Sequence, residues 1–233
     1  MTDDRNRADR PTAPAAAARA AASLVVLRDA PAGIEVLLLR RADKPGDQNS
    51  GASVFPGGLL DAADRGHYAR CVGLDDAQAS ARLNLPADGL HHYVAAVREC
   101  FEEAGLLFAS HADGRVVDLH RIDADELRAM REALHANRID MESVCEQLAV
   151  QLDLSQVAYL SHWITPLGMP KIFDTRFFIA RAPEGQTAQA DQRETVECLW
   201  IRPAEALDPS RGLKLMNVTA RTLRQLAGHG SVQ

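Results

Sequence analysis

The stretch from Leu90 to Ala104 has the apolar spacing of an amphipathic helix, and it constrains the fold more than any other part of the sequence. Apolar side chains fall at 90, 93/94, 97, 100/101 and 104, so they line one side of a helix. Gly105 follows directly, in the position of a C-terminal cap. We therefore predict a helix here, and the rest of the chain must provide a surface that its apolar side can cover.

Aliphatic and β-branched stretches occur on both sides of this helix, and they are typical of strands. The expected strands comprise residues 23–28, 34–40, 159–165, 174–180 and 197–202. Further helices are expected near residues 76–83, 124–135, 141–151 and 218–226. Because strands dominate both ends of the chain and helices lie between them, we predict an α+β fold, an α/β/α sandwich with a mixed sheet.

The length of 233 residues suits a single domain that can bury a sizeable core. Residues 1–22 show no apolar period, which predicts a flexible tail with a helical turn conceivable at 15–22. The single domain is then expected at 23–228. Glycine and proline interrupt the segment at about 65–88, which predicts an insertion within this domain.

The composition argues against several classes of protein. Lys+Arg number 26 against 32 Asp+Glu, and the net charge of −6 is unlike that of a protein that coats nucleic acid. The longest apolar run, residues 20–27, is far shorter than the roughly 20 residues that span a bilayer. The four cysteines contain no CxxC pair, so we expect reduced thiols rather than disulfides or a zinc site.

Three carboxylates, those of Glu99, Glu102 and Glu103, fall on one side of the predicted helix, opposite its apolar side. On the simplest interpretation they face solvent, as acids on an ordinary surface helix do. Their spacing argues for more, because like charges at i, i+3 and i+4 repel one another near a helix end where the macrodipole also disfavours them. A divalent cation would remove both penalties, and the turn at Gly57 and Gly58 allows backbone to approach an ion or a phosphate closely.

Residues 98–106, Arg-Glu-Cys-Phe-Glu-Glu-Ala-Gly-Leu, resemble the second half of the Nudix box, R-E-U-x-E-E-x-G-U with U apolar. Gly58 and Asp64 resemble its first half, G-x5-E, with Asp in place of Glu. Residues 65–97 separate the two halves, a spacer much longer than the family's usual one. A long insertion at this point resembles the peroxisomal-type acyl-coenzyme A diphosphatase branch of the Nudix hydrolases. Two further stretches are similar to that branch, residues 163–166 and 173–178.

The resemblance implies a Nudix-like α/β/α fold and a divalent metal, Mg²⁺ or Mn²⁺, as cofactor. The residues that it marks as catalytic are Glu103, Glu102, Glu99 and Arg98. The metal ligands that it implies are Glu99, Glu102, Glu103 and the carbonyl of Gly58. Arg98 would fix a glutamate or Asp64 through a bidentate pair, and Asp64 is expected to be structural. Substrate contacts are expected from Arg41, Arg40 and Gly57, and the general base stays open among Glu103, Glu194 and Glu197.

The implied activity is hydrolysis of a diphosphate bond in an X-diphosphate-Y substrate, with coenzyme A or acyl-coenzyme A preferred. Residues 37–42 match part of the coenzyme A signature, although Gly46 and Asp47 stand where its second arginine is expected. A nucleotide substrate such as NADH, ADP-ribose or a nucleoside triphosphate stays open. So do a non-catalytic Nudix-fold binding module, which would be expected to have lost a box carboxylate, and an unrelated fold with a solvated acidic helix.

The expected partner is a small-molecule diphosphate, with neither nucleic acid nor membrane, and a homodimer is left open. The reduced thiols lead us to expect a cytoplasmic protein. The last residues, 230–233, are unlike the S-K-L address of peroxisomal relatives, which favours the same expectation.

Other polar residues are given structural roles. Asp174 and Arg176 share a face of a predicted strand, which favours a cross-strand ion pair. His162 is expected at the rim of the core. His91 and His92 lack a ligand-type partner one helical turn on, so we expect no metal there.

Overall fold

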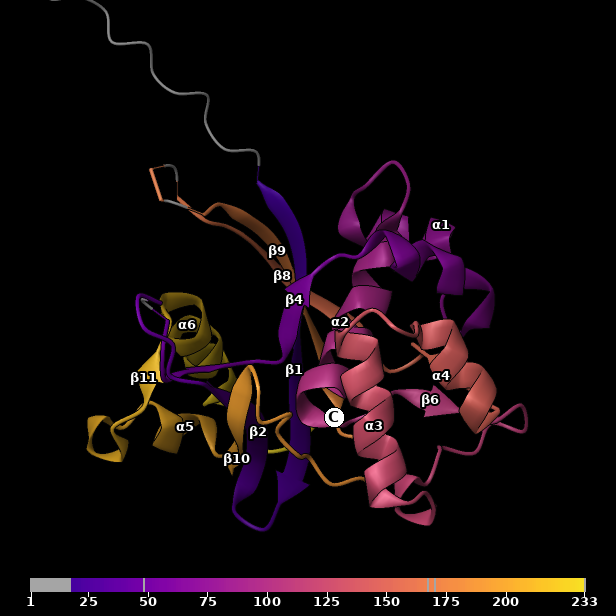
Figure 1. The fold of residues 1–233 in the computed structure, drawn as a ribbon. Helices are drawn as coiled ribbons and strands as arrows, with labels where there is room; N and C mark the ends of the chain where they lie inside the picture. Colours follow the sequence, from indigo (N-terminus) through magenta and orange to yellow (C-terminus); the bar gives the residue numbers. More distant parts are fainter. Residues whose placement is uncertain (1–17, 48, 167, 170, 233) are drawn as a thin grey trace, which may run out of the picture.

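The computed structural model describes residues 18–232 apart from 48, 167 and 170, and its centre is an eight-stranded sheet (Figure 1). The strands are β1 (Arg19–Ala30), β2 (Gly33–Arg41), β3 (Ala52–Val54), β4 (Gly57–Leu59), β8 (Ala158–Ile164), β9 (Phe173–Arg181), β10 (Thr195–Ile201) and β11 (Lys214–Leu215). Their order is β11-β3-β2-β1-β9-β8, with β10 pairing β2 and β4 pairing β1. β1 with β9 and β11 with β3 are parallel, whereas the other pairs are antiparallel, so the predicted mixed sheet is confirmed.

Helices cover both faces of this sheet (Figure 1). They are α1 (Asp76–Leu83), α2 (Gly89–Ala104), α3 (Ala124–His135), α4 (Met141–Leu148), α5 (Pro203–Ala206) and α6 (Asn217–Leu226), with 3₁₀ helices η1 (Ala62–Arg70), η2 (Leu119–Arg121) and η3 (Pro209–Arg211). A small second sheet joins β5 (Cys71–Val72), β7 (Gln151–Asp153) and β6 (Ala109–Ser110). The first four α-helices lie on one face of the large sheet and α5 and α6 on the other, as the α/β/α prediction requires.

Alternation along β1 connects the two layers. Leu24 and Val26 pack into the larger core under α2, whereas Val25 and Leu27 pack into the smaller core under α6. Successive side chains of a strand point to opposite faces, so a strand between two helical layers must be apolar at every position. This requirement explains the continuous apolar run of the sequence, in which all four side chains are at most 5% exposed.

The predicted elements are close to those of the structure. The predicted helix 90–104 corresponds to α2, whose C-cap Gly105 has a positive φ of 70° and donates its N–H to the Phe101 carbonyl at 2.9 Å. Segments 76–83 and 124–135 have the bounds of α1 and α3. The predicted insertion at about 65–88 contains the end of η1, β5 and α1, and α1 packs against α2.

Two boundary predictions are wrong. The predicted tail, residues 1–22, overlaps β1, because residues 19–22 pair with β9 and residues 21–22 also pair with β4. The helical turn conceived at 15–22 is therefore a strand from 19 onward, and its start lies outside the described residues. The predicted helix 141–151 ends at Leu148, because Ala149 adopts a left-handed conformation (φ 51°) and the chain enters β7.

Two further expectations concerned the cysteines and membrane-spanning helices. The four cysteines are free. Within the described part of the chain, none of the helices has the length and apolar character that crossing a bilayer requires.

Candidate functional site

The candidate site lies where α2 meets β4. β4 is fixed to the sheet, because Gly57 pairs with Ser23 and Gly58 with Ala22 of β1. The Ser23 hydroxyl also donates to the Pro56 carbonyl at 2.9 Å, which holds the turn before the glycines. The C-terminal half of α2 packs against this strand, so its acidic side chains meet a rigid glycine backbone.

Two of the three box glutamates lie directly on these glycines. The Glu103 Oε2 atom accepts a hydrogen bond from the Gly57 N–H at 3.0 Å. The Glu99 carboxylate occupies the space beside Gly58, where an added Cβ would lie only 2.5 Å from its Oε1 atom. Any other residue at position 58 would displace this carboxylate. The structure therefore brings Gly57 and Gly58 together with Glu99 and Glu103, which follow the glycines by 41 or more residues in the sequence.

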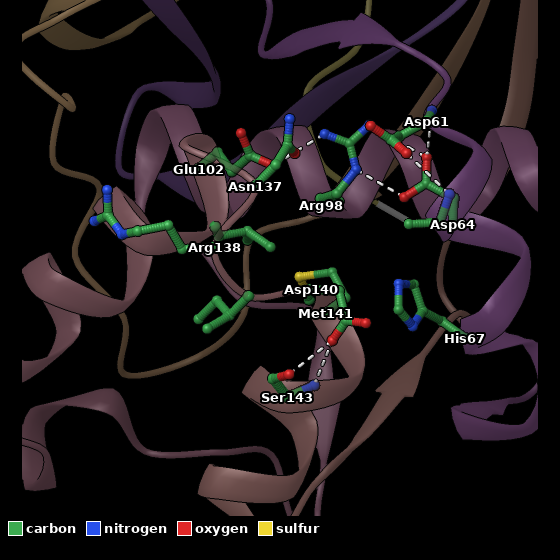
Figure 2. Close-up of a pocket in the computed structure, with 13 residues that line it drawn as sticks. Asp61, Asp64, His67, Arg98, Glu102, Asn137, Arg138, Asp140, Met141 and Ser143 are labelled. Atoms are coloured by element: carbon green, nitrogen blue, oxygen red, sulfur yellow. Dashed lines mark hydrogen bonds and ion pairs between the residues drawn. The ribbon is translucent and has the colours of Figure 1, made fainter.

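Arg98 organises the other side of the cluster (Figure 2). Its Nε and Nη2 atoms bind the two Asp64 carboxylate oxygens at 2.7 and 3.2 Å, in the bidentate geometry that was expected. Its Nη1 atom donates to Glu99 and to Glu102, at 2.9 Å each. The shorter Asp64 side chain therefore reaches Arg98, and it is fully buried. The same carboxylate accepts the Asp61 N–H at 2.9 Å and so caps η1.

The simplest interpretation of the acidic side, that it faces solvent, does not hold, whereas its predicted position against the glycine turn does. Glu102 and Glu103 are 7% and 5% exposed, and the Glu99 side chain is 14% exposed. The reason is that α3 and η1 cover this side of α2. Arg131 of α3 donates two hydrogen bonds to the Glu102 carbonyl, at 3.2 and 2.9 Å, and His135 of α3 lies 3.5 Å from the Glu102 carboxylate.

Burial sets the electrostatics of the cluster. Burial raises the pKa of Glu99 to about 7, against the opposing effect of Arg98, and Glu102 adds to the rise. Burial likewise raises the pKa of Glu103 well above its ordinary value, with Glu99 and Glu194 adding to the effect and the Gly57 N–H opposing it. For Arg98, burial disfavours the charge, but the neighbouring carboxylates outweigh it and raise its pKa. Four carboxyl groups thus share the site with one guanidinium, and the fully ionised site would hold more negative charge than its own residues neutralise.

Arg40 and Arg41 lie at the end of β2, as the sequence indicated. Both form ion pairs with the following loop, Arg40 with Asp43 at 3.1 Å and Arg41 with Asp47 at 3.3 Å. Arg41 pairs in the sheet with Thr195 of β10, whose hydroxyl donates to the Glu103 carbonyl at 3.2 Å. Arg41 is therefore one strand removed from the box, and its buried Nε atom has no hydrogen-bond partner among the described residues.

The three candidates for the general base differ in position. Glu103 is in the cluster, and Glu194 is close enough to raise its pKa. Glu197 is exposed, and it pairs with Arg40 in the sheet. Sequence reasoning missed Asp191, whose carboxylate accepts the backbone N–H groups of residues 193–195 and so shapes the loop that carries Glu194. An Asp followed by polar residues before a strand is the sequence signal of such a turn.

Other polar residues have structural roles. The Asp174–Arg176 ion pair forms at 3.4 Å within β9 rather than across strands. On the neighbouring strand β8 the Asp174 carboxylate contacts His162 at 2.5 Å, although His162 lies opposite Arg176 in the register. The His91 ring bonds the Asp61 carbonyl at 2.6 Å. Burial lowers the pKa of His92 to about 4, with Arg176 and His91 contributing, so this ring is neutral at pH 7.

A cavity of about 550 Å³ adjoins the cluster (Figure 2). Arg98, Glu102 and Asp64 form one side of it, and His67, Asp140 and the segment between α3 and α4 form the other. Glu99, Glu103 and Gly58 do not line this cavity. The insertion and the α3–α4 region thus enclose space next to Arg98, on a part of the site that the box sequence does not describe.

The sequence of the chain is similar to a known protein family and to curated proteins from other organisms. The sequence profile of the NUDT19 Nudix domain family matches residues 68–215. The chain is 30% identical over 211 residues to the human acyl-coenzyme A diphosphatase NUDT19, covering 76% of this chain and 55% of that protein. The Xenopus laevis protein of the same name is 26% identical over 213 residues, covering 78% and 56%. The chain therefore spans about half the length of the curated relatives that it matches.

A solved structure has the same fold. The crystal structure of a NUDIX hydrolase from Alicyclobacillus acidocaldarius superposes with a TM-score of 0.75 at 27% identity, covering 93% of this chain and 94% of that one. The near-complete coverage includes both helical layers and the sheet between them. The predicted fold class is confirmed.

Proposed function

The chain belongs to the NUDT19 Nudix domain family, and from this membership we propose that it is a divalent-metal-dependent hydrolase that splits a diphosphate bond in an X-diphosphate-Y substrate. Coenzyme A or an acyl-coenzyme A is the proposed substrate, because the curated relatives from human and Xenopus laevis carry the name acyl-coenzyme A diphosphatase. The bond to be split joins two phosphoryl groups, and the leaving group is therefore itself a phosphate.

One observation carries the proposal. The carboxylates of Glu99 and Glu103 are held against the backbone of Gly57 and Gly58, by a 3.0 Å hydrogen bond and by a contact that leaves no space for a Cβ. Such a combination of clustered acids and accessible backbone offers oxygen ligands from two directions. In an acidic helix with a merely structural role, one hydrogen bond from Gly57 would be the gain from burying two carboxylates on a glycine turn.

The donor set fits a hard divalent cation. Carboxylate and carbonyl oxygens are the ligands that Mg²⁺ and Mn²⁺ prefer. Glu99, Glu102, Glu103 and the Gly58 carbonyl would hold the ion. The raised pKa values of Glu99 and Glu103 show that burial disfavours their charges, and a cation would offset that cost. When bound, the metal would neutralise charge on the phosphoryl oxygens and acidify bound water.

Other residues are proposed to position the glutamates, to contact the substrate and to act as the general base. Arg98 holds Glu99 and Glu102 in place while Asp64 fixes its orientation. Arg41, with its partner-free Nε atom, is the proposed contact for substrate phosphate, together with Arg40 and the Gly57 backbone. Glu194 is the proposed general base, because it is close to Glu103 on a loop that Asp191 orders.

A substrate screen tests the proposal. The purified chain is incubated with Mg²⁺ or Mn²⁺ and with coenzyme A, acyl-coenzyme A esters, ADP-ribose, NADH or nucleoside triphosphates, and the products are identified by mass spectrometry. We expect cleavage of coenzyme A substrates into adenosine 3′,5′-bisphosphate and a phosphopantetheine, and its loss on chelation. Glu103→Gln should abolish this activity, whereas the matched control Glu126→Gln, an exposed acid in the first turn of α3, should retain it.

The outcomes separate the alternatives. Cleavage of NADH, ADP-ribose or triphosphates without coenzyme A cleavage would replace the substrate but keep the hydrolase. An absence of any metal-dependent cleavage would favour a binding module, against which all three box glutamates argue. Glu194→Gln should lose turnover and Glu197→Gln should keep it, and the reverse result would assign the base to Glu197.

A further inference from the structure

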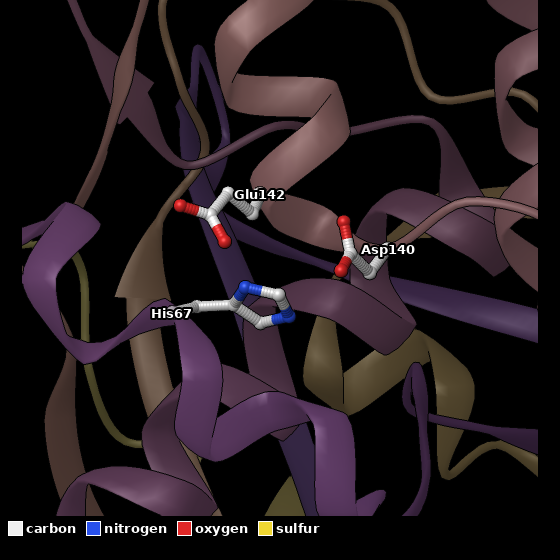
Figure 3. Close-up of side chains that lie close together, drawn as sticks. All are labelled: His67, Asp140 and Glu142. Carbon is white, nitrogen blue, oxygen red and sulfur yellow. The ribbon is translucent and has the colours of Figure 1, made fainter.

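A second group of metal-binding side chain types lies away from the glycine turn (Figure 3). His67 of η1, Asp140 at the N-cap of α4 and Glu142 in the first turn of α4 each offer one ligand atom, and these atoms lie within 4.8 Å of one another. The three residues come from segments 73 or more residues apart in the sequence, so the fold and not local sequence brings them together.

His67 is the informative member of this group. It is 2% exposed, and its Nδ1 atom is buried with no hydrogen-bond partner among the described residues. Buried polar atoms in native proteins nearly always have a partner, so an orphaned imidazole nitrogen calls for one. Figure 3 shows the ring facing the carboxylates of Asp140 and Glu142, and neutral imidazole is a common metal ligand.

The two carboxylates retain ligand capacity beside their existing bonds. Asp140 caps α4 through its Oδ1 atom, which accepts the Ser143 N–H at 2.9 Å and the Ser143 hydroxyl at 2.8 Å. Its Oδ2 atom accepts no hydrogen bond from the part of the chain that the structure describes. Glu142 lies 3.5 Å from the Arg70 Nε atom, a long contact. Arg70 makes its short pair, at 2.6 Å, with Glu146 one turn further along α4. Loss of the longer contact would therefore leave Arg70 paired.

We propose that His67, Asp140 and Glu142 bind a divalent transition-metal ion of the Zn²⁺ type, which ties η1 to α4. One nitrogen and two oxygen donors suit Zn²⁺ better than Mg²⁺, which prefers oxygen ligands. Tetrahedral bonds of about 2.0 to 2.2 Å place ligand atoms roughly 3.4 Å apart, so small side-chain rotations from the observed spacing complete the site. Water would take the fourth position.

This ion would stabilise the position of Arg98 without binding the Nudix-box acids. Asp64 and His67 belong to the same 3₁₀ helix, and Asp64 holds Arg98. His67 and Asp140 also line the cavity whose other side carries Arg98 and Glu102. A metal between η1 and α4 would thus fix the segment that positions Arg98, without contacting the box acids. It differs from the box cations in both ligands and location.

Zinc binding by the full chain tests the proposal. Excess Mg²⁺ is present throughout to occupy the box acids, and Zn²⁺ is titrated by calorimetry and counted by elemental analysis after desalting. The variants are His67→Gln, Glu142→Gln and the matched control Glu146→Gln, which removes an acid from the same helix with the same Arg70 partner. Circular dichroism checks that each variant is folded, and Glu142, being partly exposed, is the safer of the two ligand variants.

We expect the unaltered chain and Glu146→Gln to retain one Zn²⁺ more than His67→Gln and Glu142→Gln, whose affinity should fall at least about 10-fold. Equal zinc content in all four proteins, or a loss in Glu146→Gln as large as in Glu142→Gln, would overturn the proposal. Anomalous diffraction from crystals grown with Zn²⁺ gives a second measurement. A peak between His67 and the two carboxylates supports the site, and its absence refutes it.

Discussion

Replacement of Asp64 by alanine should destabilise the protein strongly, although the residue lies in no predicted helix or strand. Asp64 is fully buried, binds Arg98 through both carboxylate oxygens and accepts the Asp61 N–H. Asp64→Ala removes all three bonds and leaves Arg98, a residue only 8% exposed, without its bidentate partner.

The size of the effect follows from these contacts. Removing one partner of a buried ion pair costs about 3 to 5 kcal/mol, because the other charge stays buried without compensation. Glu99 and Glu102 still bind the Arg98 Nη1 atom, so the lower end of this range applies. For a chain of this size, about 3 kcal/mol corresponds to a fall of roughly 6 to 12 °C in Tm. Asp64→Asn keeps an acceptor and should lose less.

The assay is thermal unfolding followed by circular dichroism in EDTA, so that bound metal does not contribute. The matched control is Asp88→Asn, which weakens the exposed ion pair between Arg65, of the same 3₁₀ helix, and Asp88. Its Tm should equal that of the unaltered protein, since exposed pairs contribute little. If Asp64→Ala melted within about 2 °C of the unaltered protein, where roughly 6 °C or more is expected, the reasoning about the buried pair would be refuted.

Three further predictions concern the glycine turn and the substrate. Glu103→Gln should lower kcat by orders of magnitude yet raise Tm in EDTA, because the amide still accepts the Gly57 N–H while the buried negative charge disappears; a lower Tm would contradict this. Gly58→Ala should weaken Mg²⁺ binding, measured by calorimetry, about 10- to 100-fold in a folded protein, because its Cβ displaces the movable Glu99 carboxylate. Gly57→Ala should instead lower Tm in melting curves, because its Cβ would lie 2.4 Å from a backbone carbonyl oxygen of β1. Arg41→Ala should raise KM for coenzyme A substrates more than it lowers kcat, and a fall in kcat alone in steady-state kinetics would exclude a binding role.

The sequence was a good guide wherever a local pattern determines structure. The helix at 90–104 and the strand at 34–40 were predicted because the pattern of apolar residues in the sequence corresponds directly to the side chains that these elements bury. The end of α4 was predicted too late, because a left-handed Ala149 is not a residue that signals a helix stop. Residues 19–22 were taken for a tail since alanine and arginine carry no strand preference, and pairing with β9 overrides that.

The site was harder to predict than the fold because its chemistry depends on what covers α2. Amphipathicity showed which side of the helix faces the sheet, but it contains no information on the second layer that α3 and η1 add. The burial of Glu102 and Glu103, and with it their cost in free energy, therefore could not be predicted from spacing. The proximity of His67 to Asp140 was unpredictable for the same reason, since contacts over 73 residues produce no periodicity in the sequence.

If the proposed function is right, the charge balance of the cluster requires that a diphosphate bind here together with cations. The carboxylates of Asp64, Glu99, Glu102 and Glu103 share the region with the Arg98 guanidinium, so full ionisation leaves three formal negative charges in a buried space. A diphosphate adds further negative charge, and like charges in such surroundings repel strongly. Two divalent cations at the glycine turn would change the net formal charge of the cluster from negative to positive. In the proposed function, binding of substrate would therefore depend on binding of metal, because the same three glutamates are buried.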